Sequence, residues 1–215
     1  MTSRSWALAS RGFVVASLVA FSFFGYGCGG SSSSATLSAQ FTPSATPPGT
    51  LRLIKLVQKS ASGAFVVVQA AVYGPDVALD MYAFAFDVKI GDASVVRYVP
   101  GSAVAGNALT LFAGQGVQTI VAPDGSDPSH IVVGVTKTGG PPGNGIAGAS
   151  AVIVELTFEV LKAGTSTLTL TGDTSVPSNP PTVLDSSSPP QPITGPTFDS
   201  SSASMTGIST GGGGY

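Results

Sequence analysis

The chain has 215 residues, of which 43% are hydrophobic and 9% are charged, whereas about 25% of the residues in an average globular protein are charged. The formal net charge is −2 and Lys and Arg form no cluster after residue 11, so no basic surface for nucleic acid is expected. The 28 Gly and 16 Pro residues favour turns and interrupt helices, which argues against a helix-rich fold.

Residues 1–27 have the order of a secretory signal peptide. Arg4 and Arg11 give a basic start, residues 13–24 are almost all apolar, and small residues follow. This apolar run is shorter than the roughly 20 residues that a membrane-spanning helix needs. We therefore predict that the protein is exported and that residues 1–27 are a signal peptide of the lipoprotein type.

Cys28 is the only cysteine, so an intrachain disulfide and a multi-cysteine zinc site are excluded. The order Gly25-Tyr26-Gly27-Cys28 resembles a bacterial lipobox, in which the cysteine becomes lipid-modified, although Gly25 stands where Leu is usual. The alternative is an ordinary leader with a chance free cysteine. Lipidation of Cys28 would anchor the chain to the cell envelope, and Gly29 favours the outer membrane or cell surface. Residues 28–49 are rich in Ser, Thr and Pro and are predicted to form a flexible linker.

From residue 51 onward, apolar residues recur at every second position, which is the period of a β-strand. In residues 82–90, Tyr82, Phe84, Phe86, Val88 and Ile90 alternate with smaller or charged residues. In residues 152–160 the predicted core positions are Val152, Val154, Leu156, Phe158 and Val160. The predicted strands are 51–58, 64–73, 82–90, 94–98, 108–113, 117–122, 130–137, 152–160, 165–171 and roughly 196–206.

Turn signals separate these segments, among them Gly74-Pro75-Asp76 and Pro123-Asp124-Gly125. About nine or ten short strands at this spacing predict an all-β sandwich or barrel. A Pro-rich segment at 176–196 precedes the last predicted strand, and residues 207–215 are predicted to be a Gly-rich tail.

Three segments are informative together: Tyr82-Ala83-Phe84-Ala85-Phe86-Asp87-Val88, residues 95–101 with their turn, and residues 145–170. In this order they resemble the cohesin-type β-sandwich, which is related to certain cellulose-binding modules. The resemblance implies a nine-stranded jelly roll over residues 50–206 and a non-catalytic binding module. Cohesins hold dockerin modules, which makes a dockerin-like protein the expected partner; the related modules bind polysaccharide, which is the alternative.

The titratable residues give little support for catalysis, and we predict that the protein is not an enzyme. His130 is the only histidine, and Asp127 three residues before it predicts either a surface turn with an Asx hydrogen bond or a small polar site. Glu155 and Glu159 lie four residues apart on one strand, which separates them by about 13 Å at ~3.3 Å per residue. That separation exceeds both glycosidase geometries.

The strand face that carries Glu155, Thr157 and Glu159 is either a solvated face or a polar contact surface for a partner. For polysaccharide, the aromatic candidates for stacking are Tyr73, Tyr98 and Phe112, each of which could equally belong to the core, since the only Trp lies in the leader.

No cofactor is expected. The carboxylates of Asp124, Asp127, Asp76 and Asp80 leave a structural calcium open, although no loop has the repeated acidic pattern of a dedicated site. The glycine-rich segment 139–145 lacks a Lys and a following helix, so it is not a phosphate loop; it predicts a loop at the rim of a binding face.

Overall fold

The computed structural model describes residues 36–45, 52–74, 80–109, 111, 113–139, 150–172 and 180–210, and these residues form thirteen strands. The strands are β1 (Thr36–Thr42), β2 (Leu53–Ser62), β3 (Phe65–Tyr73), β4 (Ala83–Ile90), β5 (Val96–Tyr98), β6 (Val104–Ala105), β7 (Gly116–Pro123), β8 (His130–Thr138), β9 (Ser150–Val160), β10 (Gly164–Thr171), β11 (Thr182–Leu184), β12 (Thr197–Phe198) and β13 (Ala203–Thr210). Within the described ranges there is no helix that could cross a membrane.

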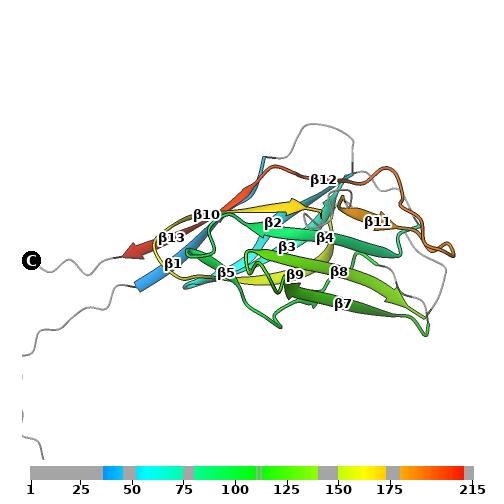
Figure 1. Ribbon diagram of the computed structural model, residues 1–215, viewed down its shortest axis with the longest axis horizontal. Coiled ribbons are helices and arrows are strands. Elements are labelled where there is room, and N and C mark those ends of the chain that lie inside the picture. Colours follow the sequence, from blue (N-terminus) through cyan, green and yellow to red (C-terminus); the bar gives the residue numbers. More distant parts are fainter. Residues whose placement is uncertain are drawn as a thin grey trace, which may run out of the picture. The chain divides into compact units, whose positions relative to one another are not determined.

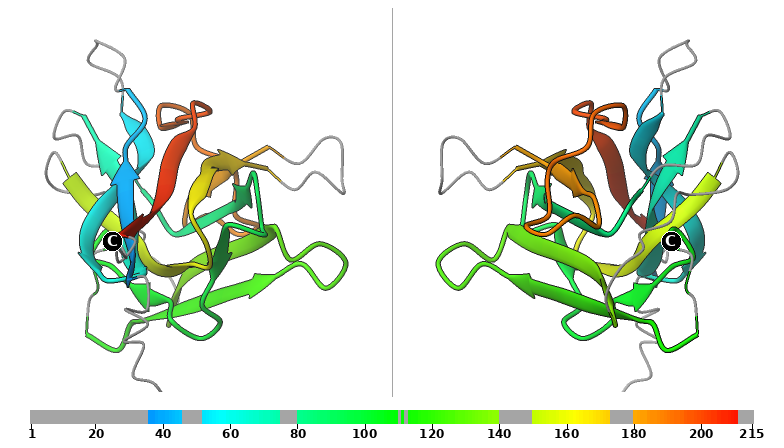
Figure 2. Two further views of the ribbon diagram at one scale, coloured as in Figure 1. Left: turned by 90° about the vertical axis from the view of Figure 1, so that its left-hand side faces the viewer. Right: turned by 90° about the vertical axis from the view of Figure 1, so that its right-hand side faces the viewer.

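The strands form two sheets that pack face to face, which confirms the predicted all-β jelly-roll sandwich (Figures 1 and 2). Sheet A has the order β1-β13-β10-β4-β8-β7, and β11 continues the edge of β4 beyond β10. Sheet B has the order β12-β2-β3-β9-β5, with β6 also paired to β9. All pairs are antiparallel except that of β12 with β2.

Alternation along β4 places four of the five predicted side chains in the core; the fifth, Tyr82, precedes β4 and is half-buried. Phe84, Phe86, Val88 and Ile90 are at most 3% exposed. Their inner face packs against the inner face of sheet B, where Val66, Val68 and Leu156 are also buried. Because burying one such side chain contributes about 1.5–3 kcal/mol, this packing is the main source of stability.

A β-bulge in β9 changes the predicted core face of that strand. Ala70 pairs with Val154 and Ala71 with Val152, so Ile153 is an extra residue in β9. A bulge of this kind shifts the alternation by one position. Ile153 is therefore buried at 1% exposure and Val152 lies on the other face, half-buried, so the prediction for Val152 was wrong while Val154 to Val160 are inward as expected.

The predicted linker at 28–49 was wrong where the structure describes it, because β1 lies inside it. Leu37, Ala39 and Phe41 alternate with polar residues, and Phe41 is 6% exposed in the core. The high Ser and Thr content conceals this alternation. β1 pairs along its whole length with β13, which continues to Thr210. The strands thus extend from Thr36 to Thr210, beyond the predicted limits of 50–206, and part of the predicted tail is strand.

Two other segments differ from the prediction. Residues 108–113 were expected to be a strand, but Ala108 and Leu109 lie in a bend and fill the edge of the core. The Pro-rich segment includes β11, in which Val183 is buried, and β12, so the predicted last strand at 196–206 is split. The turn that splits it begins at Asp199, whose side chain accepts the Ser201 N–H.

The turns use one local motif repeatedly, Asp-x-Ser. In each case the Asp carboxylate accepts hydrogen bonds from both the N–H and the hydroxyl of the Ser two residues later, which is an Asx-type turn. The five Asp residues are Asp92, Asp124, Asp127, Asp185 and Asp199. Much of the small acidic content of the chain is therefore used to shape turns.

Asp199 also ties β1 to the sandwich. It is 6% exposed, and its carboxylate accepts hydrogen bonds from the Ser201 and Ser44 hydroxyls. Lys55 Nζ donates to the Ser44 carbonyl at 3.0 Å. Burial raises the pKa of Asp199, but the hydrogen bonds from Ser201 and Ser44 together with the charge of Lys55 outweigh it, so the pKa lies below its usual value.

We predict that Asp199→Asn lowers the free energy of unfolding at pH 7 by about 1–3 kcal/mol, because charge-assisted hydrogen bonds are lost. A carboxyl with a lowered folded-state pKa stabilises the fold above its unfolded pKa of about 3.9, and this stabilisation is lost as the pH falls through the lowered folded value. Urea unfolding of both proteins from pH 7 down to pH 3 should show the difference shrinking at low pH. A difference independent of pH would contradict the prediction.

Candidate protein-binding face

The outer side of sheet A carries a patch with few charges and an apolar centre on its last three strands. The register sets the outward residues of β4, β8 and β7 side by side, in three rows. The rows are Ala83–Thr136–Gln118, Ala85–Gly134–Ile120 and Asp87–Val132–Ala122. We call these nine residues the β4–β8–β7 face; the three strands lie next to one another in Figure 1.

The centre of this face is apolar and exposed. Ile120 is 60% exposed and Val132 is 45% exposed. Gly134 of β8 lies between Ala85 of β4 and Ile120 of β7. A Cβ atom built on Gly134 would approach only Ile120, at 3.9 Å. Because Gly134 has no side chain, the backbone is accessible in the middle of the face, and a partner can approach it closely.

A small hollow adjoins the face on the β4 side. It has a volume of about 100 Å³ and is lined by Ala85, Asp87, Val132 and Pro180, among others. Asp87 is the only ionisable member of the face and is 4% exposed. The contact area is therefore nearly free of charge, and its nearest exposed charge along β4 is Lys89.

The other half of the outer side of sheet A is lined with hydroxyl groups. Thr165 Oγ1 on β10 lies 3.1 Å from Thr206 Oγ1 on β13, and Thr169 Oγ1 lies 2.6 Å from Oγ of Ser202, the residue before β13. These hydroxyls bond across the strand pair. Sheet A thus presents one polar half and one apolar half, and the apolar half is the stronger candidate for an interface.

The predicted face with Glu155, Thr157 and Glu159 lies on the outer side of sheet B. Lys59 Nζ is 2.5 Å from Glu155 Oε1, and Gln69 also donates to that oxygen. Burial raises the pKa of Glu155, but the hydrogen bonds from Lys59 and Gln69 lower it more. Glu159 is paired with Arg97 at 2.6 Å. Both carboxylates thus have ion-pair partners in the same sheet; their role in binding stays a prediction.

Asp127 and His130 form the surface turn that was one of the two sequence interpretations. Asp127 Oδ1 accepts the Ser129 N–H at 2.9 Å, and the hydrogen bonds from Ser129 lower the pKa of Asp127. His130 Nδ1 lies 3.9 Å from Asp127 Oδ2. Among the described residues, no group of three or more His, Cys, Asp or Glu side chains could hold a metal ion.

Of the three aromatic candidates for sugar stacking, the structure describes Tyr73 and Tyr98. Tyr98 is 3% exposed and packs edge-on against Phe158 at 6.0 Å, so it belongs to the core. Tyr73 is half-buried, and Lys55 Nζ lies 5.8 Å from its ring centroid. Several residues considered in the sequence lie outside the described part of the chain: Phe112, Asp76, Cys28, residues 1–27 and most of the glycine-rich segment 139–145.

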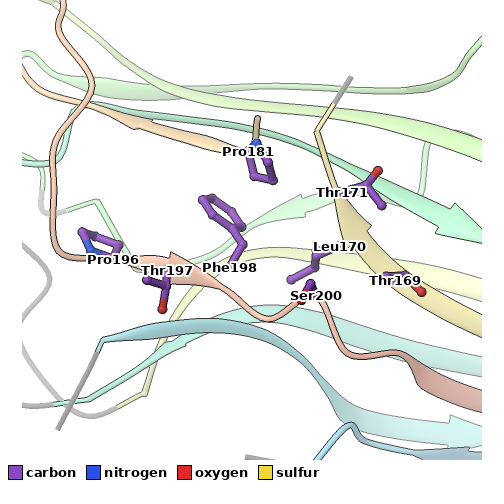
Figure 3. A pocket seen from close by; sticks show the side chains of 8 residues that line it. All are labelled: Thr169, Leu170, Thr171, Pro181, Pro196, Thr197, Phe198 and Ser200. Atoms are coloured by element: carbon purple, nitrogen blue, oxygen red, sulfur yellow. The ribbon is translucent and has the colours of Figure 1, made fainter. Parts of the chain in front are cut away.

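A separate groove lies between β10 and residues 196–200. It has a volume of about 510 Å³ and an uncharged lining of Thr169, Leu170, Thr171, Pro181, Pro196, Thr197, Phe198 and Ser200. Figure 3 shows the Phe198 ring in the lining of this groove, near Pro181. The same ring packs against Phe86 in the core at 5.7 Å. The lining contains no acid, base or nucleophile pair that would indicate catalysis.

No protein-family model and no curated protein sequence matches the chain. Among solved structures, it is similar to a type II cohesin domain from the cellulosome of Acetivibrio cellulolyticus, with 17% identity over 73% of this chain and 95% of that one and a TM-score of 0.45. It is similar to type II cohesin A11 from Bacteroides cellulosolvens, with 14% identity over 68% and 99% and a TM-score of 0.41. A type II cohesin–X-dockerin complex from Acetivibrio cellulolyticus matches with 11% identity over 70% and 95% and a TM-score of 0.45.

The β4–β8–β7 face was not predicted from the sequence, although a signal for it exists. In residues 117–122 and 130–137 the outward positions include Ile120, Ala122 and Val132. Their outer side thus combines apolar residues with the polar Gln118 and Thr136, whereas the outer side of an ordinary half-solvated antiparallel strand is mostly polar. Adjacent exposed apolar residues of this kind are typical of interaction surfaces.

We predict that Ile120→Ser and Val132→Ser change the free energy of unfolding by less than about 0.5 kcal/mol, because exposed sites lose little on substitution. The matched control is Val133→Ser, next to Val132 on the same strand but 1% exposed. It should cost about 2 kcal/mol or more, since it buries a hydroxyl and removes apolar contacts. Equal costs for Val132 and Val133, measured by urea denaturation, would show that the faces are assigned incorrectly.

Proposed function

We propose that this chain is a non-catalytic, extracytoplasmic protein-binding module whose β4–β8–β7 face receives its partner. The observation that carries the proposal is the exposed apolar centre formed by Ile120 and Val132 around Gly134. Isolated exposed apolar residues are common, but adjacent ones on a rigid sheet mark an interaction surface.

The chemistry of the face defines the partner it would accept. Its centre offers apolar contact, and Gln118 and Thr136 at one end offer hydrogen bonds. Interface cores are typically poor in charge and surrounded by polar groups, which this arrangement matches. A partner would bring a flat or gently convex apolar surface, such as one side of a helix, with a side chain for the hollow beside Val132.

The resemblance to cohesins makes a dockerin-type module the specific partner that we propose. The resemblance includes residues 82–88, which supply the β4 column of the face. A polysaccharide ligand is the alternative; since Tyr98 is buried, it would have to bind without that residue.

We also propose that lipid at Cys28 holds the module on the cell envelope, at the outer membrane or cell surface. The support is the order of residues 1–28: a basic start, a short apolar run and small residues before the only cysteine. An anchored module would offer its face to extracellular partners from a fixed position, with the residues between Cys28 and β1 as a short tether.

To test the face, we would replace Gly134 with Arg, which places a long charged side chain in the middle of it. Because a Cβ there meets only Ile120 at 3.9 Å, the fold should tolerate the change. The matched control is Thr165→Arg on the hydroxyl half of sheet A. Wild type and the control should retain a partner from an extract of the source cells, with calcium present, and Gly134→Arg should lose it.

Equal capture by all three proteins would place the binding surface elsewhere. Capture of no protein, with retardation of the wild type in gels that contain a soluble polysaccharide, would favour the glycan alternative. Circular dichroism spectra of the three proteins show whether the variants keep the β fold.

To test the anchor, Cys28→Ser should move the full-length protein from the membrane fraction to the soluble fraction. The substitution removes the residue that would carry the acyl chains, and these chains would supply the attachment to the membrane. Fractionation of cells followed by immunoblotting measures this. Continued membrane association of the Cys28→Ser protein would contradict lipidation and leave the function of the face untouched.

A further inference from the structure

β7 is the outermost strand of sheet A, and its outer edge has no strand partner in the described part of the chain. Figure 1 shows it at the lower border of the sheet. The nearby strand β6 forms its ladder with β9 instead. β7 is eight residues long, Gly116–Pro123.

The hydrogen-bond pattern shows which backbone groups of β7 point to the open side. Asp124 N–H donates to the His130 carbonyl, so the even-numbered residues of β7 exchange hydrogen bonds with β8. The N–H and C=O groups of Val117, Thr119 and Val121 therefore point away from β8. Pro123, at the end of the strand, has no N–H and limits any further pairing there.

Edge strands of soluble proteins usually carry protection against pairing with another chain, such as a charge, an early proline or a bulge. β7 has the sequence Gly-Val-Gln-Thr-Ile-Val-Ala-Pro and contains no charged residue. Its register with β8 is regular from Gly116 to Pro123, so no bulge interrupts it. Val, Thr and Ile at its centre favour a strand. This edge is thus suited to pairing.

We propose that β7 pairs antiparallel with β7 of a second copy of this chain, which joins the two A sheets across a twofold axis at Thr119. The three outward-pointing positions are symmetric about Thr119, so Val117 would meet Val121 of the second copy and Thr119 would meet its own equivalent. Two-fold contacts of this kind use one surface twice, which is the commonest form of homodimer.

The side chains and charges favour a second copy over an unrelated strand. Because β7 is uncharged, two copies meet without repulsion. Ile120, 60% exposed, would pack against Gln118 of the second copy at a non-hydrogen-bonded pair, where side chains approach most closely. The joined sheets would also place two β4–β8–β7 faces side by side, which would raise the avidity for a partner with two binding elements.

A charge exchange on the outward side of β7 tests both the dimer and its register. One variant of the full-length chain carries Gln118→Lys with Ile120→Lys, and a second carries Gln118→Glu with Ile120→Glu. In the proposed register, position 118 lies opposite position 120 of the other copy, so each variant places like charges opposite each other. A mixture of the two places opposite charges there.

Sedimentation of the detergent-solubilised proteins over a concentration series gives their masses, with the detergent contribution subtracted. The wild type should have the mass of two chains, each variant alone that of one chain, and the mixture that of two chains again. A wild type that has the mass of one chain throughout would overturn the proposal, as would a mixture that fails to associate.

Thr119→Pro gives a second measure that leaves the β4–β8–β7 face intact. It removes an N–H that points to the open edge and none that bonds to β8, so the sandwich should persist while the dimer is lost. A folded Thr119→Pro dimer would overturn the proposal. Gly134→Arg changes the β4–β8–β7 face and leaves the β7 edge unaltered. Partner capture therefore tests the face and sedimentation tests the dimer, so either proposal can fail while the other holds.

Discussion

The structure depends on one interaction, the packing of the inner faces of two sheets whose side chains alternate. Phe84, Phe86 and Val88 on sheet A and Val66, Val68 and Leu156 on sheet B are buried by this contact. Because side chains on a strand point alternately to opposite faces, each residue that points into the core places the residues before and after it on the outer side. The outer surfaces, and with them every candidate interface, are consequently determined by the core.

The outer surfaces differ because the outward residues differ, not because the backbone does. On sheet A, the same antiparallel ladder carries hydroxyls at Thr165 and Thr206 and apolar groups at Ile120 and Val132. On sheet B, Glu155 and Glu159 are engaged by Lys59 and Arg97. With few charges in the chain, recognition would rest on shape and apolar contact, and long-range electrostatic steering would contribute little.

The sequence predicts the fold much better than the candidate site, for physical reasons. The alternation in 82–90 is visible because its outward residues are small or charged. The strand at 36–42 is hidden by Ser and Thr, and the bulge at Ile153 depends on pairing with β3. The β4–β8–β7 face combines residues from three strands, so it appears only when the register that places Ala85, Gly134 and Ile120 in one row is known.

The most direct measurement is photo-cross-linking in intact cells, with a photoreactive amino acid placed at Thr136 in the β4–β8–β7 face or at Thr157 on the outer side of sheet B. Mass spectrometry of the adducts identifies what each position touches. We expect a covalent adduct with a protein other than this chain from position 136 and none from position 157. An adduct from position 157 alone would contradict binding through the β4–β8–β7 face.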